Sequence, residues 1–176
     1  MCFMQKYFNV NLEFDKTKVD LIIESTISEG GKGYVCVIES NNLTVANRNK
    51  QFGEVVNNAL VNVCDGSVLA MILGKIHRQD YRSYIGADIF YNYVNKKKYI
   101  QYFLGNTPHI LSGLQTNLQK IDSRVESMSF EELPFRKVEE FDYEVIAQQI
   151  NEANPDIIWV SLGAPKQEFF MAKLLP

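Results

Sequence analysis

The clearest structural signal in the chain is Ile157-Ile158-Trp159-Val160-Ser161-Leu162-Gly163-Ala164-Pro165-Lys166-Gln167-Glu168. An apolar, β-branched run of strand length is ended by a glycine and a proline, and a helical pattern starts directly after them. A strand, a tight turn and a helix start form the place where an open α/β sheet holds its ligands. The three polar side chains are therefore predicted at the carboxyl edge of a strand, where free backbone N–H groups favour an anion. The alternative is an ordinary turn with solvated side chains.

Strand-like and helix-like segments alternate through the rest of the chain as well. Apolar runs of strand length occupy residues 34–38, 60–64 and 99–104, with a shorter one at 128–130 and a loose strand or hairpin within 1–14. Helical spacing predicts helices at 15–29, from about 40 to 59, at 67–73 before Gly74, at 86–94, at 108–121 and at 142–153. Strands that alternate with helices are typical of a parallel sheet.

We therefore predict an α/β fold with a mostly parallel, Rossmann-like sheet and helices on both of its faces. The 176 residues suffice for one domain with a sizeable core but not for two. The predicted domain covers residues 1–176, and residues 1–33 form an N-terminal edge strand and helix.

Composition excludes several classes of function. A net charge of -3 argues against a nucleic-acid-binding protein, which is usually basic. His77 and His109, the two histidines, have no partner at metal-ligand spacing, so no metal site is predicted. Cys2, Cys36 and Cys64 are widely spaced, which favours buried free thiols in a reducing compartment. Without a signal peptide or a membrane-spanning run, the chain is expected in the cytoplasm.

Polar clusters follow several of the predicted strands. They lie at residues 39–42, at Asp65-Gly66, at 86–88 and at 166–168. An Asp-Gly pair after a strand is most often only a turn, but four such clusters at one edge of a sheet indicate a site. A dinucleotide-binding turn is absent, because no G-x-G-x-x-G follows the first long strand. The glycines within 29–33 lack the Lys-Ser/Thr of a phosphate loop, and no G-x-S-x-G predicts a hydrolase.

The opening stretch carries a family resemblance. Residues 162–168, with Asn154-Pro155-Asp156-Ile157 before them, resemble the signature of the WecG/TagA/CpsF glycosyltransferases. Further matches in the same order are Asp65-Gly66, Gly86-Ala87-Asp88, Phe103-Leu104-Gly105-Asn106 and Leu133-Pro134-Phe135. The resemblance implies transfer of an N-acetylmannosamine-type or related sugar from a UDP donor to a lipid-linked acceptor at the membrane surface. It implies inversion at the anomeric carbon, without a metal or a further cofactor.

The resemblance also implies roles for individual residues. Asp65 would be the general base that deprotonates the acceptor hydroxyl, and Lys166 and Gln167 would hold the donor or its diphosphate. The remaining positions predicted to bind substrate on this basis are Gly66, Gly86, Asp88, Gly105 and Glu168.

The chain departs from the family pattern in three places. Glu39 and Asn41 stand where the family usually has a Thr-Pro-Asn turn, and we expect them to contact the substrate instead. Arg82, which we also expect to bind substrate, lies one place earlier than the Arg that often precedes the G-x-D motif. The chain stops at Pro176, where relatives continue, so a C-terminal part is expected to be missing. A non-catalytic nucleotide-sugar-binding module is the alternative function, and the oligomeric state, a homo-oligomer included, is left open.

Overall fold

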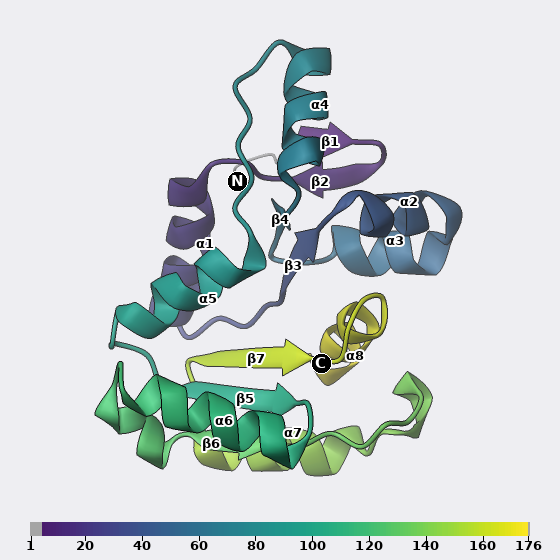
Figure 1. The fold of residues 1–176 in the computed structure, drawn as a ribbon. Helices are drawn as coiled ribbons and strands as arrows, with labels where there is room; N and C mark the ends of the chain where they lie inside the picture. Colours follow the sequence, from purple (N-terminus) through teal and green to yellow (C-terminus); the bar gives the residue numbers. More distant parts are fainter. Residues whose placement is uncertain (1–4, 176) are drawn as a thin grey trace. The chain divides into compact units, whose positions relative to one another are not determined.

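A computed structural model describes residues 5–175, and the chain divides into two compact units (Figure 1). Unit 1 contains residues up to Ile89 together with Leu175, and unit 2 contains Phe90–Leu174. The boundary falls inside helix α5 (Gly86–Asn95). Each unit is described by itself, and a single domain over residues 1–176 stays a prediction.

Unit 1 begins with an antiparallel hairpin of β1 (Gln5–Tyr7) and β2 (Val10–Leu12). Its two turn residues, Phe8 and Asn9, both have positive φ (47° and 63°), which matches the right-handed twist of the strands. After β2, Glu13 forms a parallel bridge to Val63, so this segment lies along a strand edge as the alternating pattern predicted. Cys2 lies outside the described residues.

A parallel strand pair forms the centre of unit 1. β3 (Val35–Ile38) pairs with β4 (Val61–Cys64), so that Ile38 lies opposite Cys64. Helix α1 (Lys16–Ser28) precedes β3, and the Asp15 carboxylate accepts hydrogen bonds from the first backbone N–H groups of that helix. Cys36 and Cys64 are buried free thiols, as predicted.

The prediction of one helix between β3 and β4 was wrong. The segment forms α2 (Ser40–Arg48) and α3 (Lys50–Asn57), with a break at Asn49. The backbone of Asn49 is extended, and its side-chain oxygen accepts the N–H of Phe52 at 3.0 Å, which starts the second helix. The N-cap formed by Asn49 therefore starts a new helix, although the helical spacing of apolar residues continues across it.

Helix α4 (Ser67–His77) is also longer than predicted. It begins at Ser67 as predicted, after the N-cap residue Gly66, and it continues past Gly74 to a left-handed C-cap at Arg78. Gly74 does not stop the helix. A Cβ there would lie 2.7 Å from the carbonyl oxygen of Gln79, so the glycine is needed for close approach of the following loop.

Unit 2 is built on three parallel strands. β5 (Gln101–Gly105) lies between β6 (Ser129–Glu131) and β7 (Ile157–Ser161). The surrounding helices are the rest of α5, α6 (Pro108–Gln119), α7 (Tyr143–Ala153) and α8 (Lys166–Leu174). Two short 3₁₀ helices, η1 (Ser123–Ser127) and η2 (Val138–Glu140), complete the unit.

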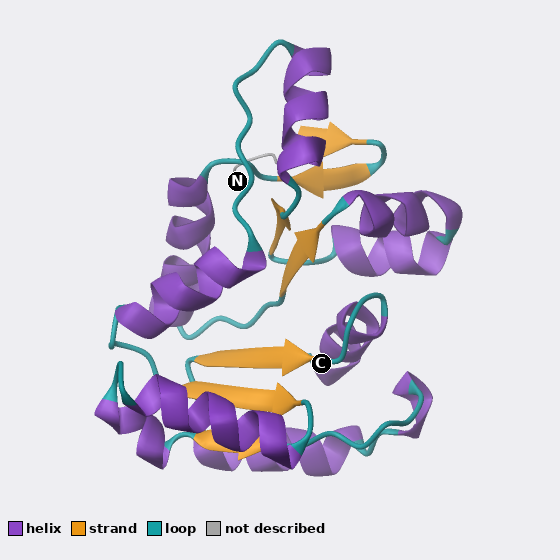
Figure 2. Cartoon of the chain, viewed as in Figure 1, coloured by secondary structure: helices purple, strands orange, loops and turns teal. Residues whose placement is uncertain are grey.

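Helices cover both faces of this sheet (Figure 2). On one side, Phe103 packs with Leu111 and Leu118 of α6. On the other, the neighbouring strand residues Tyr102 and Leu104 pack in one cluster with Ile146 and Ile150 of α7 and Phe170 of α8. Successive residues of a strand point to opposite faces, so both sides of β5 are core. The predicted α/β class, with parallel strands and helices on both faces, is confirmed.

Candidate functional site

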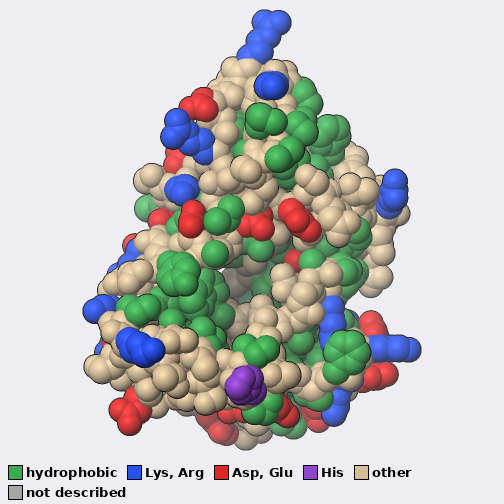
Figure 3. Space-filling model, in the orientation of Figure 1, with side chains coloured by type: hydrophobic (Ala, Val, Ile, Leu, Met, Phe, Trp, Pro, Cys, Tyr) green, Lys and Arg blue, Asp and Glu red, His purple; other side chains and the backbone are tan. Residues whose placement is uncertain are grey.

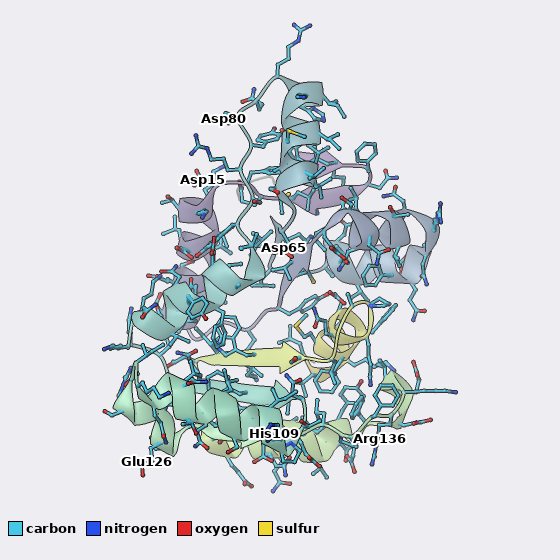
Figure 4. The ribbon with its side chains drawn as sticks, viewed as in Figure 1. Asp15, Asp65, Asp80, His109, Glu126 and Arg136 are labelled. Carbon is cyan, nitrogen blue, oxygen red and sulfur yellow. The ribbon has the colours of Figure 1, made fainter. Side chains whose placement is uncertain are left out.

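The carboxylate of Asp65 joins two elements of unit 1. Its backbone N–H donates to the carbonyl oxygen of Ile38 at 3.0 Å, which places the residue directly beyond the carboxyl ends of β3 and β4. Its side-chain Oδ1 accepts the backbone N–H of Gly86, the first residue of α5, at 2.7 Å. An anion at a helix N-terminus is stabilised by the free N–H groups there. The side chain of Asp65, labelled in Figure 4, is therefore oriented by the start of α5.

The second carboxylate oxygen of Asp65, Oδ2, does not take part in this hydrogen bond. The carboxylate is half-buried, and its Oδ2 accepts no hydrogen bond from residues 5–175. A carboxylate with one oxygen fixed and one oxygen open can accept a proton from a ligand hydroxyl. The arrangement suits a positioned base.

Gly66 and Cys64 flank this carboxylate. Gly66 is the N-cap residue of α4, so the starts of α4 and α5 both lie close to Asp65. The Cys64 thiol donates to the carbonyl oxygen of Gly66 at 3.6 Å, and burial raises its pKa to about 11. The thiol therefore stays protonated at neutral pH and is a poor nucleophile.

Glu39 is the first residue after β3, at the same end of the strand pair as Asp65. It directly follows Ile38, which pairs with Cys64, so both carboxylates come from the same edge of the strand pair. Glu39 is exposed and forms the N-cap position of α2 without a side-chain cap bond, and Asn41 is exposed in the first turn of the same helix. Both predicted binding residues are thus accessible at this edge.

Arg82 and Asp88 have other partners in unit 1. Arg82 forms an exposed ion pair with Asp80 at 3.3 Å, and Asp88 forms one with Lys16 at 3.6 Å. Within the part of the chain that the structure describes, neither makes a hydrogen bond to Asp65. Surface pairs of this kind contribute little stability, so both side chains remain free to be recruited by a ligand.

A pocket that the sequence did not predict lies beside Arg82. It has a volume of about 820 Å³ and is lined by aromatic rings and by charges of both signs. Phe14 stacks on Tyr81 with centroids 4.1 Å apart, and the hydroxyls of Tyr7 and Tyr81 share a hydrogen bond. Glu13 lies in the wall and accepts the N–H of Phe14 at 2.9 Å. No short motif marks these residues, because they come together only through long-range pairing.

In unit 2, Gly105 ends β5 opposite Ser161. Its φ is +105°, and a Cβ would lie 2.4 Å from the carbonyl oxygen of Ser161. Asn106 follows with φ +68°, and its Nδ2 donates to the Ser161 hydroxyl at 2.8 Å. The close approach of two strands therefore explains why a glycine stands here, while substrate binding by Gly105 stays a prediction.

Lys166 starts α8, as the opening stretch of sequence predicted. Its ammonium group lies 5.3 Å from the centre of the Phe135 ring and 5.2 Å from that of Phe141. Phe135 is fully exposed at 103%. A cation over an exposed ring remains accessible to an anion, and the rings orient it.

Gln167 and Glu168 follow Lys166 in the first turn of the helix. The Gln167 backbone N–H donates to the carbonyl oxygen of Gly163 at 2.9 Å, and its Nε2 donates to Glu168 Oε1 at 3.4 Å. Glu168 is fully buried, and this burial raises the pKa of its carboxyl. The first turn therefore offers Lys166 and Gln167 to a ligand more readily than Glu168.

Residues 5–175 contain neither a metal-binding cluster nor a membrane-spanning helix. No group of three His, Cys, Asp or Glu side chains is arranged there to hold a metal ion. No helix in that range is long and apolar enough to cross a membrane.

Comparison with known proteins identifies a family. A family model, described as the glycosyl transferase WecG/TagA/CpsF family, matches residues 7–176, which is nearly the whole chain. Among curated proteins, none matches the chain.

Proposed function

Because the chain belongs to the WecG/TagA/CpsF family of glycosyl transferases, we propose that it is an inverting transferase with a UDP-sugar donor. The transferred sugar is of the N-acetylmannosamine type or related to it. The acceptor is a sugar on polyprenyl diphosphate, and the product enters a bacterial cell-surface polysaccharide, such as an exopolysaccharide, or a teichoic acid linkage. The family places the chain in cell-surface polysaccharide synthesis, and the donor, sugar and acceptor are our proposals.

The observation that carries the proposal is the orientation of Asp65. The Gly86 N–H fixes Oδ1 at 2.7 Å and leaves Oδ2 open, at an edge where parallel strands end. In the proposed step, Oδ2 takes the proton of the acceptor hydroxyl. The oxygen of the acceptor hydroxyl then forms a bond to the anomeric carbon as the bond from this carbon to UDP breaks, and UDP leaves with the electron pair.

The leaving diphosphate needs positive charge and N–H donors. We assign Lys166 and Gln167, with the backbone N–H groups at the start of α8, to the donor, since these groups lie at a strand end and Lys166 is held by two rings. The UDP-sugar is a substrate, and the proposal needs no further cofactor. A lipid-linked acceptor would bring a cytoplasmic enzyme to the inner face of the cell membrane.

The test is Asp65→Asn, measured as sugar transfer from UDP-N-acetylmannosamine to a short-chain, detergent-soluble lipid acceptor. Asparagine keeps an oxygen for the Gly86 N–H but is not a base, so turnover should fall by roughly 10²–10⁴-fold. The dissociation constant for UDP, measured by calorimetry, should not change. Glu54→Gln, which removes an exposed carboxylate from α3 of the same unit, is the control and should keep full turnover.

Two results would contradict the assignment. If Asp65→Asn retained the turnover of the unchanged chain, Asp65 would not be the base. If the chain bound UDP-sugars but neither form transferred sugar, a non-catalytic nucleotide-sugar-binding module would be the better description.

A further inference from the structure

Helix α4 is apolar on its outer side as well as its inner side. Leu69, Ala70, Leu73 and Gly74 are buried in unit 1. Val68, Met71, Ile72 and Ile76 are exposed at 59%, 51%, 45% and 59%. A surface helix normally turns charged and polar residues to this side.

The exposed side chains form one continuous band, which we call the outer stripe (Val68, Met71, Ile72 and Ile76). Their spacing of three and four residues places them on one face of the helix. Figure 3 shows apolar side chains gathered along this part of unit 1. Single exposed apolar residues are ordinary, but a contiguous band marks a surface that contacts something else.

The charged residues of α4 and its C-cap are positive. The α4 sequence, SVLAMILGKIH, has no acidic residue, and Lys75 falls within the stripe by its spacing. Arg78 follows at the C-cap, and both side chains are exposed. Lysine and arginine can lay their apolar stems along such a surface while the charged end reaches an anionic headgroup.

The position of α4 connects this surface to Asp65. Gly66 is its N-cap, and Asp65 is the residue before it, so the helix leads directly away from the proposed base. An acceptor carried on a membrane lipid would approach Asp65 from a bilayer. Apolar side chains, cations and a lipid-linked substrate all favour the same contact.

We propose that the outer stripe, with Lys75 and Arg78, docks onto the surface of a bilayer that contains anionic phospholipid. The helix lies in the interface without crossing the bilayer, since it has only 11 residues. The inference deepens the proposed function and rests on it for the lipid-linked acceptor.

The test is sedimentation of the 176-residue chain with phosphatidylcholine vesicles, with and without phosphatidylglycerol. Met71→Gln with Ile76→Gln replaces two exposed apolar side chains by helix-forming polar ones and should lower the partition coefficient about tenfold or more. Lys75→Gln with Arg78→Asn should remove most of the dependence on phosphatidylglycerol, and asparagine tolerates the left-handed C-cap.

A matched control separates this effect from general loss of apolar surface. Leu21→Gln in α1 and Val145→Gln in α7 also replace exposed apolar residues, and binding should stay within about twofold of the unchanged chain. Thermal melts and circular dichroism confirm that each variant is folded.

Two outcomes would overturn the docking proposal. One is vesicle binding that the stripe variants leave unchanged. The other is a dimer, detected by light scattering without vesicles, that Met71→Gln with Ile76→Gln dissociates while no vesicle binding occurs, because the stripe would then contact a second copy.

Failure of docking and failure of the proposed function are distinguishable. Asp65-dependent transfer to the soluble acceptor without stripe-dependent vesicle binding would reject docking alone. Stripe-dependent vesicle binding without any transfer would reject the proposed reaction alone.

Discussion

At the scale of single residues, Asp65 combines a bond within the fold with the proposed chemistry. Asp65→Ala removes the acceptor for the Gly86 N–H and should lower the free energy of unfolding by about 1 kcal/mol. Asp65→Asn keeps an oxygen there and should cost less than half as much, because only the charge is lost. Urea denaturation of both variants measures the difference, and equal losses would show that the hydrogen bond contributes nothing.

Gly105 gives a second prediction at this scale. In Gly105→Ala the new Cβ would lie 2.4 Å from the Ser161 carbonyl oxygen at a φ of +105°, so we expect a loss of about 3 kcal/mol. Gly113→Ala is the matched control. It lies in α6 with nothing within 4 Å, and alanine there should stabilise the chain by about 0.8 kcal/mol. A neutral Gly105→Ala in thermal melts would contradict the close strand approach.

The sequence predicted these residues unevenly. Asp65, Gly66 and Gly86 were recognised as neighbours at a sheet edge, because strand ends can be placed from apolar runs. The hydrogen bond from Gly86 to Asp65 could not be derived from the sequence, because it depends on how the chain after α4 folds back toward the end of β4. Glu168 was expected to bind substrate, yet it is fully buried. Which side of a short helix faces the core is decided by packing, which local sequence does not report.

At the scale of elements, boundaries were the weakest predictions. The break at Asn49 had a visible signal, since asparagine is a preferred N-cap, but the apolar spacing ran across it. At Gly74 the sequence carried a signal for a helix end, but the helix continues through it. A glycine inside a helix can end it or admit a close neighbour, and only the position of Gln79 distinguishes the two.

Asp122 gives a prediction for the 3₁₀ helix η1. It is buried, and its hydrogen bonds to the Arg124 side chain hold its pKa below the usual range. A carboxyl whose pKa is depressed on folding stabilises the fold above its unfolded pKa of about 3.9, and this stabilisation is lost as pH falls through the folded value.

We therefore expect Asp122→Asn to lower the free energy of unfolding by about 1 kcal/mol at pH 7, a modest value because the side chain of Arg124 is 44% exposed. The difference from the unchanged chain should shrink below about pH 4. Denaturation at a series of pH values measures it, and a difference that is the same at pH 3 and pH 7 would exclude the charged pair as its source.

At the scale of the whole molecule, the sequence predicts the fold class but carries no signal for the boundary between the two compact units. Alternating strands and helices can hardly form anything other than a parallel sheet covered on both faces. The boundary between the two compact units, however, falls within α5, between Ile89 and Phe90. The nearest glycine, Gly86, marks the start of α5, and no proline or change in composition stands at the boundary itself.

Ligand binding to the whole chain gives the last prediction. UDP at one hundred times its dissociation constant should stabilise the folded chain by about 2.7 kcal/mol and raise its melting temperature by roughly 5–10 °C. NAD should have no effect, because the glycine-rich dinucleotide turn is absent. Differential scanning fluorimetry compares the two, and a response to NAD in place of UDP would reject the donor class.

The two oxygens of Asp65 have separate roles, because Oδ1 holds α5 and Oδ2 is the proposed proton acceptor. This separation has an evolutionary consequence. Aspartate and asparagine codons differ by one nucleotide, and the exchange leaves the oxygen that holds α5 in place. On the proposed role, one point mutation therefore yields a folded descendant that binds donor but no longer transfers sugar. Selection for folding alone would not remove such a pseudoenzyme, so this lineage can lose catalysis in one step and keep a nucleotide-sugar receptor.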